Sequence, residues 1–487
     1  MRVSDTKPAK ERVRGQTPGP VSGGSDSQGI TALVPSKAIS NTATAFALVM
    51  ALTAGTARAQ EVLRDAETEA FFREMSAPII TAAGLDPKNV DVVLLRDGEI
   101  NAFVAGGQTV YVNSGLIGAA EHAQEVQGVF AHELGHIVGG HSIRGGEGTR
   151  PAIAITLLSL LLGAAAAAAG SPEAGLGIFM AGETAAEGKY LAFSRAQEAT
   201  ADAASVKFLS GAGISGRGSI SFFEKLQNME FRYGFHRTAD DEFYSTHPMT
   251  ADRLATLKDA FEQDPAWSKP EDPNLQRRFL RVKAKLYGYL AEPQQTLIAY
   301  PEYLNDVPAH YARAYAYHKQ AFMDKALAET DAILAQDPDD AYALELKGQV
   351  LLESGRPVDA IAPLRRAVAL TQNQALIATT FGHALLATED RANFPEAERV
   401  LKTAVVKDHD NPFAWYELGT VYEAQGDTPR ARLASAEQEQ MQLQYVEAMR
   451  NAEAAQAALP KGSPDWLRAQ DIAMSTRAMV EHKRKKK

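Results

Sequence analysis

Two histidines with three residues between them could hold a metal ion. His132 and His136 stand in the sequence His-Glu-Leu-Gly-His, inside a run whose apolar residues recur every three or four positions. Such a run predicts a helix with one buried face. The two imidazoles would then project from the same face one turn apart, and Glu133, rotated by about 100°, could point at a metal-bound water. The arrangement suits zinc-assisted hydrolysis, and a surface helix with two stray histidines is the alternative.

A hydrolytic zinc site needs a third protein ligand. His141 is one candidate, but it follows Gly139-Gly140, which should end the helix that carries His136. Its spacing from His136 also departs by one residue from the pattern that places a third histidine on the same metal. We therefore expect His141 beside the site or at the surface.

Glu198 is a better candidate for the third ligand. It lies in the segment from Ser194 to Asp202, which is rich in Ala and free of Pro and Gly, so the segment should be helical. Glu198 and Asp202 would share one face of that helix. Glu198 could complete the metal site, while Asp202 accepts a hydrogen bond from the outer nitrogen of a ligating histidine. An exposed acidic face paired with Arg195 is the alternative.

Composition limits the classes of function. A chain of 487 residues should form two or more domains, and a net charge of −10 gives no reason to expect nucleic acid as a partner. The chain contains no cysteine. This excludes a cysteine-based zinc site, a catalytic thiol and disulfides.

The first 59 residues predict export from the cytoplasm. Residues 1–40 are rich in Gly, Pro, Ser and charge and should be unstructured. An uncharged apolar run from Ala43 to Ala54 follows, and then Ala57-Arg58-Ala59, a small-x-small cleavage signal. We expect a signal peptide cut after Ala59. A membrane anchor is the alternative, although the run is shorter than the ~20 residues that span a bilayer.

A second uncharged stretch separates the candidate ligands. It runs from Ala152 to Ala169, and a shorter apolar segment follows from Leu176 to Ala181. A single membrane span would put the histidines and Glu198 on opposite sides of the bilayer, and the shorter segment is too short to return the chain. We expect a helical lid or hairpin over residues 152–181 that covers the site, touches a membrane surface or packs on a partner. A buried core helix is the alternative.

The second half of the chain carries a repeat. Glycines at 348, 382 and 419 are 34 and 37 residues apart, and alanines at 326, 360 and 397 give the same intervals. With Trp415-x-x-Leu-Gly-x-x-Tyr422, this spacing predicts tetratricopeptide repeats over residues 310–455, stacked into an α-solenoid that binds protein or peptide. The three extra residues should fall in a loop around Asp390 to Asn393. An irregular helical bundle is the alternative.

The segments that flank the repeats carry weaker signals. Residues 266–309 should form a helical linker. Residues 456–487 form a polar tail that ends in a basic cluster, and a capping helix is expected there. Contact of this tail with anionic lipid is the alternative.

Several further motifs resemble the M48 family of zinc metallopeptidases, in the family's order. They are Asn101-Ala-Phe, Gly106-Gly107, Val110-Tyr-Val-Asn-Ser-Gly-Leu116, the His-Glu-Leu-Gly-His helix, Glu198 with Asp202, and Thr246-His-Pro248 with Arg253. The resemblance covers roughly residues 65–260. It implies a mainly α, gluzincin-like metallopeptidase domain with a small β-sheet edge over residues 60–265, one zinc ion per chain, and a periplasmic location.

The resemblance also implies roles for individual residues. His132, His136 and Glu198 would bind zinc, and Glu133 would be the catalytic acid and base. His247 corresponds to a histidine near the metal, and either His247 or Arg253 could donate to the oxyanion.

The strand before the metal helix could bind substrate. Residues 109–112, Thr-Val-Tyr-Val, are rich in β-forming side chains and follow the Gly106-Gly107 turn. They could form the edge strand to which an extended peptide pairs, and a core strand is the alternative.

Two classes of function fit the sequence. The first is a secreted zinc endopeptidase whose repeats bring it protein clients. The resemblance implies that it acts in quality control or assembly of envelope proteins, with the outer-membrane assembly machinery as a possible partner. The second is a chaperone or scaffold that acts through the repeats and carries a latent metal site. The intact Glu133 favours the enzyme, because a structural metal site needs no base beside its ligands.

Overall fold

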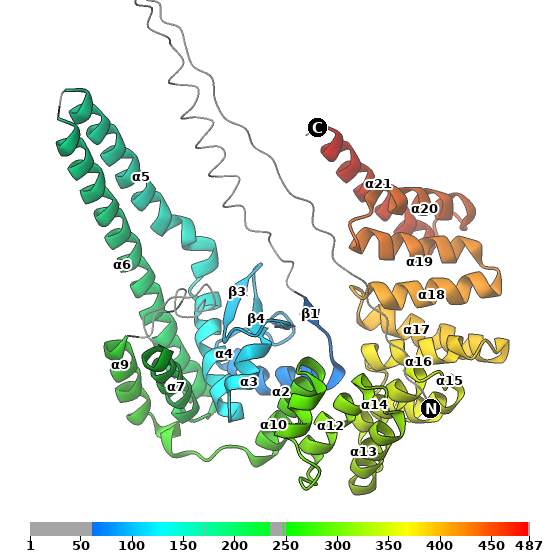
Figure 1. Cartoon of the computed structure of the whole chain (residues 1–487). Helices are drawn as coiled ribbons and strands as arrows, with labels where there is room; N and C mark the ends of the chain where they lie inside the picture. The colour runs from blue at the N-terminus through cyan, green and yellow to red at the C-terminus, as the bar shows by residue number, and fades with distance from the viewer. Residues whose placement is uncertain (1–60, 170, 234–246, 248–249, 486–487) are drawn as a thin grey trace, which may run out of the picture. The chain divides into compact units, whose positions relative to one another are not determined.

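The computed structural model describes residues 61–169, 171–233, 247 and 250–485 (Figure 1). From Gln60 onward the chain forms one compact unit. The expected signal peptide, residues 1–59, lies outside the described residues.

A small mixed sheet stands near the start of the described chain. Its strands are β1 (Val62–Leu63), β2 (Asp91–Leu95), β3 (Ala102–Ala105) and β4 (Thr109–Asn113), in the spatial order β1-β2-β4-β3. Strand β4 pairs in parallel with β2 and antiparallel with β3. The prediction that residues 109–112 form an edge strand is therefore wrong. Gly106 and Gly107 both have positive φ and turn the chain so that β3 lies outside β4.

Helices surround this sheet and form the core of the domain. They are α2 (Ala66–Ala82), α3 (Ser114–Ala119), α4 (Ala123–Val138), α5 (His141–Ala168), α6 (Pro172–Ala212), α7 (Arg217–Tyr233), α9 (Ala251–Glu262), the short η1 (Pro265–Ser268) and α10 (Pro273–Leu290). Phe71, Phe130, Phe223 and Phe279, from α2, α4, α7 and α10, are buried in one hydrophobic cluster. Helix α10 therefore contributes to this core, although it falls in the segment expected as a linker.

Helices α5 and α6 form a long antiparallel hairpin between the candidate ligands (Figure 1). Helix α4 ends at Val138, as the two glycines predict, and Gly140 has a φ of 64° that lets the chain turn into α5. Leu176–Ala181 is no separate short segment, because it continues into the 41-residue α6, which returns the chain to Glu198. Only 11% of the stretch Thr149–Ala168 is buried, so the core-helix alternative is wrong.

Paired helices make up the rest of the chain. After α11 (Pro293–Ala299) come α12 (Val307–Lys319), α13 (Met323–Gln336), α14 (Ala341–Glu353), α15 (Pro357–Leu370), α16 (Ala375–Ala387), η2 (Arg391–Asn393), α17 (Phe394–Lys407), α18 (Pro412–Gln425), α19 (Thr428–Met441), α20 (Tyr445–Ala458) and α21 (Pro464–Lys485). The three extra residues form η2, in the predicted loop. Helices α20 and α21 pack together, so the expected polar tail continues the array.

The recurring glycines explain the repeat spacing. A Cβ at Gly348 would lie 2.4 Å from Leu364 on the paired helix, and one at Gly382 would lie 2.5 Å from Leu401. In these two pairs, α14 with α15 and α16 with α17, a residue larger than glycine would clash with the paired helix, whereas a Cβ at Gly419 would lie 3.4 Å from Ala434. The 34-residue interval of the sequence is therefore a packing constraint, and the irregular-bundle alternative is wrong.

A buried ionic cluster joins α2, α10 and α14. Lys285 on α10 is 5% exposed and places its Nζ 2.5 Å from Asp65 and 3.6 Å from Glu67. Arg281, one turn earlier, binds Glu67 at 2.8 Å and Asp340 at 2.7 Å. Burial alone would lower the pKa of Lys285, but the surrounding carboxylates hold it well above its usual value. The cluster thus depends on Lys285 being charged.

Replacing Lys285 by methionine should lower the free energy of unfolding by about 3–5 kcal/mol, because Asp65 loses its cation and the buried Glu67 keeps only Arg281. Denaturant unfolding followed by circular dichroism measures the change. Lys258→Met is the matched control, because its pair with Glu224 is about half exposed on both sides and is expected to contribute roughly 0–1 kcal/mol. Equal effects of the two variants would contradict a stabilising role for the buried cluster.

Candidate metal centre

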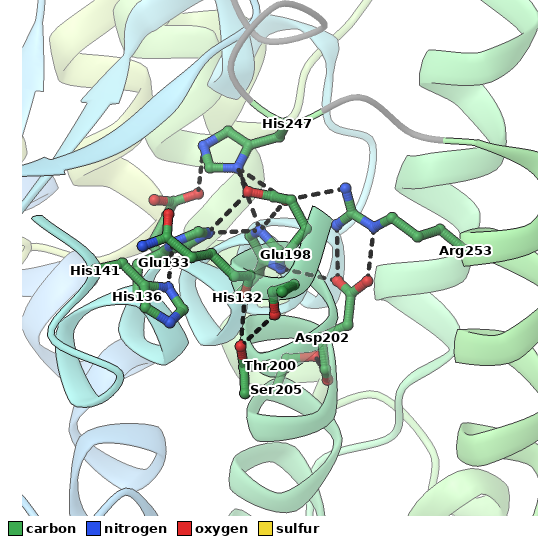
Figure 2. A network of polar contacts seen from close by, with 12 residues as sticks. His132, Glu133, His136, His141, Glu198, Thr200, Asp202, Ser205, His247 and Arg253 are labelled. Carbon is green, nitrogen blue, oxygen red and sulfur yellow. Dashed lines mark hydrogen bonds and ion pairs between the residues drawn. The ribbon is translucent and has the colours of Figure 1, made fainter. Parts of the chain in front are cut away.

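Four side chains from three parts of the chain converge on one point. His132 and His136 come from α4, Glu198 comes from α6, and His247 comes from the segment before α9 (Figure 2). Each offers a ligand atom, and these atoms all lie within 4.8 Å of one another. The two Nε2 atoms of the α4 histidines are 3.1 Å apart, and each lies within 3.5 Å of a Glu198 oxygen. The structure thus brings together the three candidate ligands that the sequence analysis named and His247, which it expected near the metal.

The contact between α4 and α6 sets this geometry. Gly135, between the two histidines, faces Ala201, between Glu198 and Asp202, and a Cβ at Gly135 would lie 2.8 Å from the Ala201 Cα and carbonyl oxygen. The helices therefore touch backbone to backbone. Glycine at this position of the His-Glu-Leu-Gly-His motif is required by packing.

Asp202 and Arg253 lie behind the ligands. The Asp202 Oδ1 is 3.0 Å from the Nδ1 of His132, on the side of the ring opposite the other ligands, where the sequence analysis expected it. Arg253, at the start of α9, binds Asp202 through two nitrogens at 2.7 and 2.9 Å and reaches Glu198 at 2.9 Å. The guanidinium therefore holds Glu198 and Asp202 in position (Figure 2).

The second ring nitrogen of His136, Nδ1, contacts His141. The Nδ1 of His141 is 2.9 Å from the Nδ1 of His136. His141 is 9% exposed, and it therefore lies beside the site and outside the ligand cluster. Its position follows from the turn at Gly140, which begins α5 directly after the end of α4.

Glu133 points into the same space as the ligands. Its side chain is 1% exposed, and its Oε1 has no hydrogen-bond partner among the described residues, with the Nε2 of His247 3.7 Å away. A buried carboxylate oxygen without a hydrogen bond destabilises the folded protein unless a donor binds to it. The arrangement provides a base beside the ligand cluster.

Burial and neighbouring charges shift the acid–base properties of the cluster. Burial raises the pKa of Glu133 above its usual value, because water no longer stabilises the carboxylate. Burial and the neighbouring histidines lower the pKa of His136 to about 2, so its ring is neutral and can bind a cation. Burial would also lower the pKa of His132, but Asp202 and Glu198 raise it to about 10, so a metal must displace a proton there.

Phe223 belongs to the site although sequence reasoning did not single it out. Its ring on α7 lies edge-on to the imidazole of His132, with centroids 6.2 Å apart. The sequence gives no signal that separates Phe223 from the other core aromatic residues. It limits the rotation of His132 and keeps water from that side of the ring.

Comparison with protein families divides the chain into two parts. Residues 62–260 match the model of "Peptidase family M48", and residues 311–375 and 383–442 match a "Tetratricopeptide repeat" model. The first match contains every residue of the candidate site. The second covers most of the paired helices.

The chain is also similar to several named proteases. The chain is 23% identical over 353 residues to the beta-barrel assembly-enhancing protease of Yersinia pestis, covering 71% of this chain and 70% of the relative. The protein of that name from Escherichia coli strain K12 is 25% identical over 290 residues, 58% of either chain. Metalloprotease LoiP of the same strain is 30% identical over 178 residues, 37% of this chain and 64% of the relative.

A methyl group at Gly135 should damage the site without removing any of its polar atoms. Gly135→Ala forces α4 and α6 apart, so we expect unfolding free energy to fall by about 1–3 kcal/mol and metal affinity to fall by at least about tenfold. Titration calorimetry measures the affinity.

Gly188→Ala is the matched control. Gly188 lies on α6, and no other part of the described chain has an atom within 4 Å of the position that its Cβ would take. The change should therefore leave metal affinity unaltered. Unchanged metal affinity in Gly135→Ala would show that the helix contact does not set the ligand geometry.

Proposed function

We propose that the chain is a zinc-dependent endopeptidase that hydrolyses protein clients in the cell envelope. Residues 62–260 match peptidase family M48, and residues 311–375 and 383–442 match a tetratricopeptide repeat. The observation that carries the proposal is the buried cluster of three imidazoles and one carboxylate with Glu133 beside it. A binding or scaffolding domain has no use for a buried base at that point.

The donor set fits zinc. Nitrogen and carboxylate oxygen ligands in a nearly tetrahedral arrangement are those that zinc takes in hydrolytic enzymes. His132, His136 and Glu198 would hold the ion, with Asp202 orienting His132 from behind. When bound, zinc supplies Lewis-acid polarisation and makes water acidic enough to attack near neutral pH.

Glu133 does the proton transfer. Its buried carboxylate is more basic than an exposed one, so it can take the proton from the attacking water. The same group then delivers the proton to the leaving amine. Arg253 keeps Glu198 and Asp202 in place by its three short contacts, which supports a positioning role for it, and His247 is then the candidate donor to the oxyanion.

The substrate would pair with β3. This strand is the outer one next to β4, and it lies against α4, which carries Glu133. An extended peptide added to its open edge would gain main-chain hydrogen bonds and run past the metal centre. Such pairing tolerates many sequences, as an enzyme acting on unfolded clients requires.

The clients are proposed from the relatives and the repeats. Two relatives are named beta-barrel assembly-enhancing proteases, and each match extends beyond the length of the peptidase domain. We place the chain in the periplasm after cleavage near Ala59. Its repeats would bind envelope proteins or the outer-membrane assembly machinery, and residues 152–181 would contact a membrane surface.

A chaperone or scaffold with a latent metal site is the second candidate. The repeats alone would carry that function, so Glu133→Gln should leave it intact. Quantitative proteomics of envelope proteins in cells with the wild-type chain or Glu133→Gln separates the two. Accumulation of uncleaved clients supports the endopeptidase, and identical proteomes support the scaffold.

The metal ligands and the base should respond differently to substitution. Purified protein should carry about one zinc ion per chain, and His136→Ala should lose it, because the remaining donors cannot hold the ion tightly. Glu133→Gln should keep the zinc and lose hydrolysis by at least about a hundredfold. Elemental analysis and cleavage of an unstructured peptide measure the two properties.

His122→Ala is the control for the metal measurement. His122 caps the same helix, but its side chain is exposed and pairs with Glu271 away from the cluster. The His122→Ala variant should therefore keep about one zinc ion per chain. Full zinc occupancy in His136→Ala, or normal turnover by Glu133→Gln, would refute the assignment.

His247 has two possible roles. Its Nδ1 is 3.0 Å from Glu198 and 3.4 Å from the Nε2 of His132, a position from which it could bind zinc as a fourth ligand and displace water. Its Nε2 is 3.7 Å from Glu133, and from a slightly different position it could donate to the oxyanion. We propose a switch between the two positions, with the ligating one as the resting state.

His247→Ala should therefore raise basal proteolysis, including self-cleavage, because the resting ligand is lost. A loss of turnover of roughly a hundredfold or more, without self-cleavage, would assign His247 to the oxyanion alone. Cleavage rates and zinc affinity are measured on the same preparation. Unchanged activity together with unchanged zinc affinity would remove His247 from the site.

A further inference from the structure

Helix α5 exposes a large apolar surface that no described part of the chain covers. From Pro151 to Ala169 it carries no charged side chain, and its charges are confined to the first turns, nearer the metal centre. Six large side chains of this stretch are more than half exposed: Ile153, Leu157, Leu158, Leu160, Leu161 and Leu162. A contiguous apolar surface of this kind marks a contact with a partner or a membrane.

The packing of the hairpin shows which way this surface faces. Ser159 and Gly163 of α5 lie against α6, since a Cβ at Gly182 would meet the Ser159 side chain and one at Gly163 would lie 2.7 Å from the Gly175 carbonyl oxygen. Leu161 stands midway between Ser159 and Gly163 in sequence. At about 100° per residue it therefore points directly away from α6.

Beyond the first turns of α5, the charged side chains of the hairpin stand on α6. Gly175, Gly182 and Ala186 are the residues of α6 that lie toward α5 or are buried near it. The exposed acids Glu173 and Glu187 stand at roughly 120° or more from Gly175, and the exposed Glu183 stands at about 80°, beside the contact with α5. The hairpin thus has an uncharged apolar side made by α5 and an acidic side made by α6, where the exposed Leu176 and Met180 stand among the acids.

The two sides limit how the hairpin can meet a bilayer. His136 precedes it and Glu198 ends it, and these two side chains lie 3.5 Å apart, so both ends of the hairpin are on the same side of any membrane. Insertion of the hairpin tip first would place Glu183, about 17 Å along α6 from Pro172, near the middle of a ~30 Å hydrocarbon core. A charged carboxylate is unfavourable there.

We propose that α5 lies in the plane of a lipid bilayer surface, with the face around Leu157, Leu158 and Leu161 embedded and α6 stacked above it on the water side. In this orientation the exposed acids Glu173, Glu183 and Glu187 stay outside the hydrocarbon. The net charge of −10 gives no attraction to anionic lipid, so apolar burial drives binding. Binding should therefore occur on uncharged lipid and be insensitive to salt. This contact does not depend on the proposed peptidase activity.

The absence of cysteine makes a direct test possible. The chain from Gln60 onward, which forms one compact unit, is prepared with a single cysteine at Leu161 or at Met180 and labelled with a polarity-sensitive fluorophore. The two positions are matched, because their side chains are 69% and 61% exposed, but Met180 stands on the acidic side of α6. With uncharged phosphatidylcholine vesicles, the label at position 161 should shift to the blue at low and high salt, and the label at 180 should not.

Lysine substitutions give the corresponding change in affinity. Leu161→Lys should weaken vesicle binding by at least about tenfold, and Met180→Lys should change it by less than about twofold. Equal blue shifts at 161 and 180 would overturn the in-plane orientation in favour of tip insertion. No shift at 161 with vesicles would overturn the membrane contact, and a shift that rises with protein concentration alone would assign the face to a second copy of the chain.

Discussion

The backbone contact between α4 and α6 is the constraint on which the metal centre depends. Two imidazoles stand on one helix and two carboxylates on the other, and the close approach at Gly135 and Ala201 brings three of these groups within reach of one ion and the fourth, Asp202, within reach of His132. Because Glu198 and Asp202 are one turn apart, one faces the ligand atoms of the histidines while the other holds His132 from behind. A small change in the separation of the helices would disturb both contacts at once.

Compensation of buried charge then determines what surrounds the ligands. Glu133, Glu198 and Asp202 are all buried, and carboxylates in this position need cations or hydrogen-bond donors. Arg253 supplies three contacts to two of them, which leaves Glu133 with a raised pKa and with one oxygen atom that accepts no hydrogen bond from the described residues. Within the described chain, the protein thus neutralises Glu198 and Asp202 and leaves Glu133, the proposed base, without such a partner.

The sequence predicted those parts of the molecule that depend on local spacing. The four-residue steps from His132 to His136 and from Glu198 to Asp202, and the glycine intervals of the repeats, each follow from helix geometry. The position of β4 inside the sheet was not predictable in this way, because it depends on which strands pair across the chain. The position of Phe223 was not predictable either, since any core aromatic residue of α7 has the same local pattern.

The long hairpin lies between two ligands of one site, yet its length does not affect their positions. Helix α5 begins beside the candidate metal centre, and α6 runs antiparallel to it and returns to the centre at Glu198. Helical turns added equally to both helices at the tip would therefore lengthen the hairpin without moving its two ends. The hairpin could become longer or shorter while His136 and Glu198 keep their positions. Within such a domain, the distance from the catalytic centre to whatever the hairpin contacts is a property that sequence change can adjust independently of catalysis.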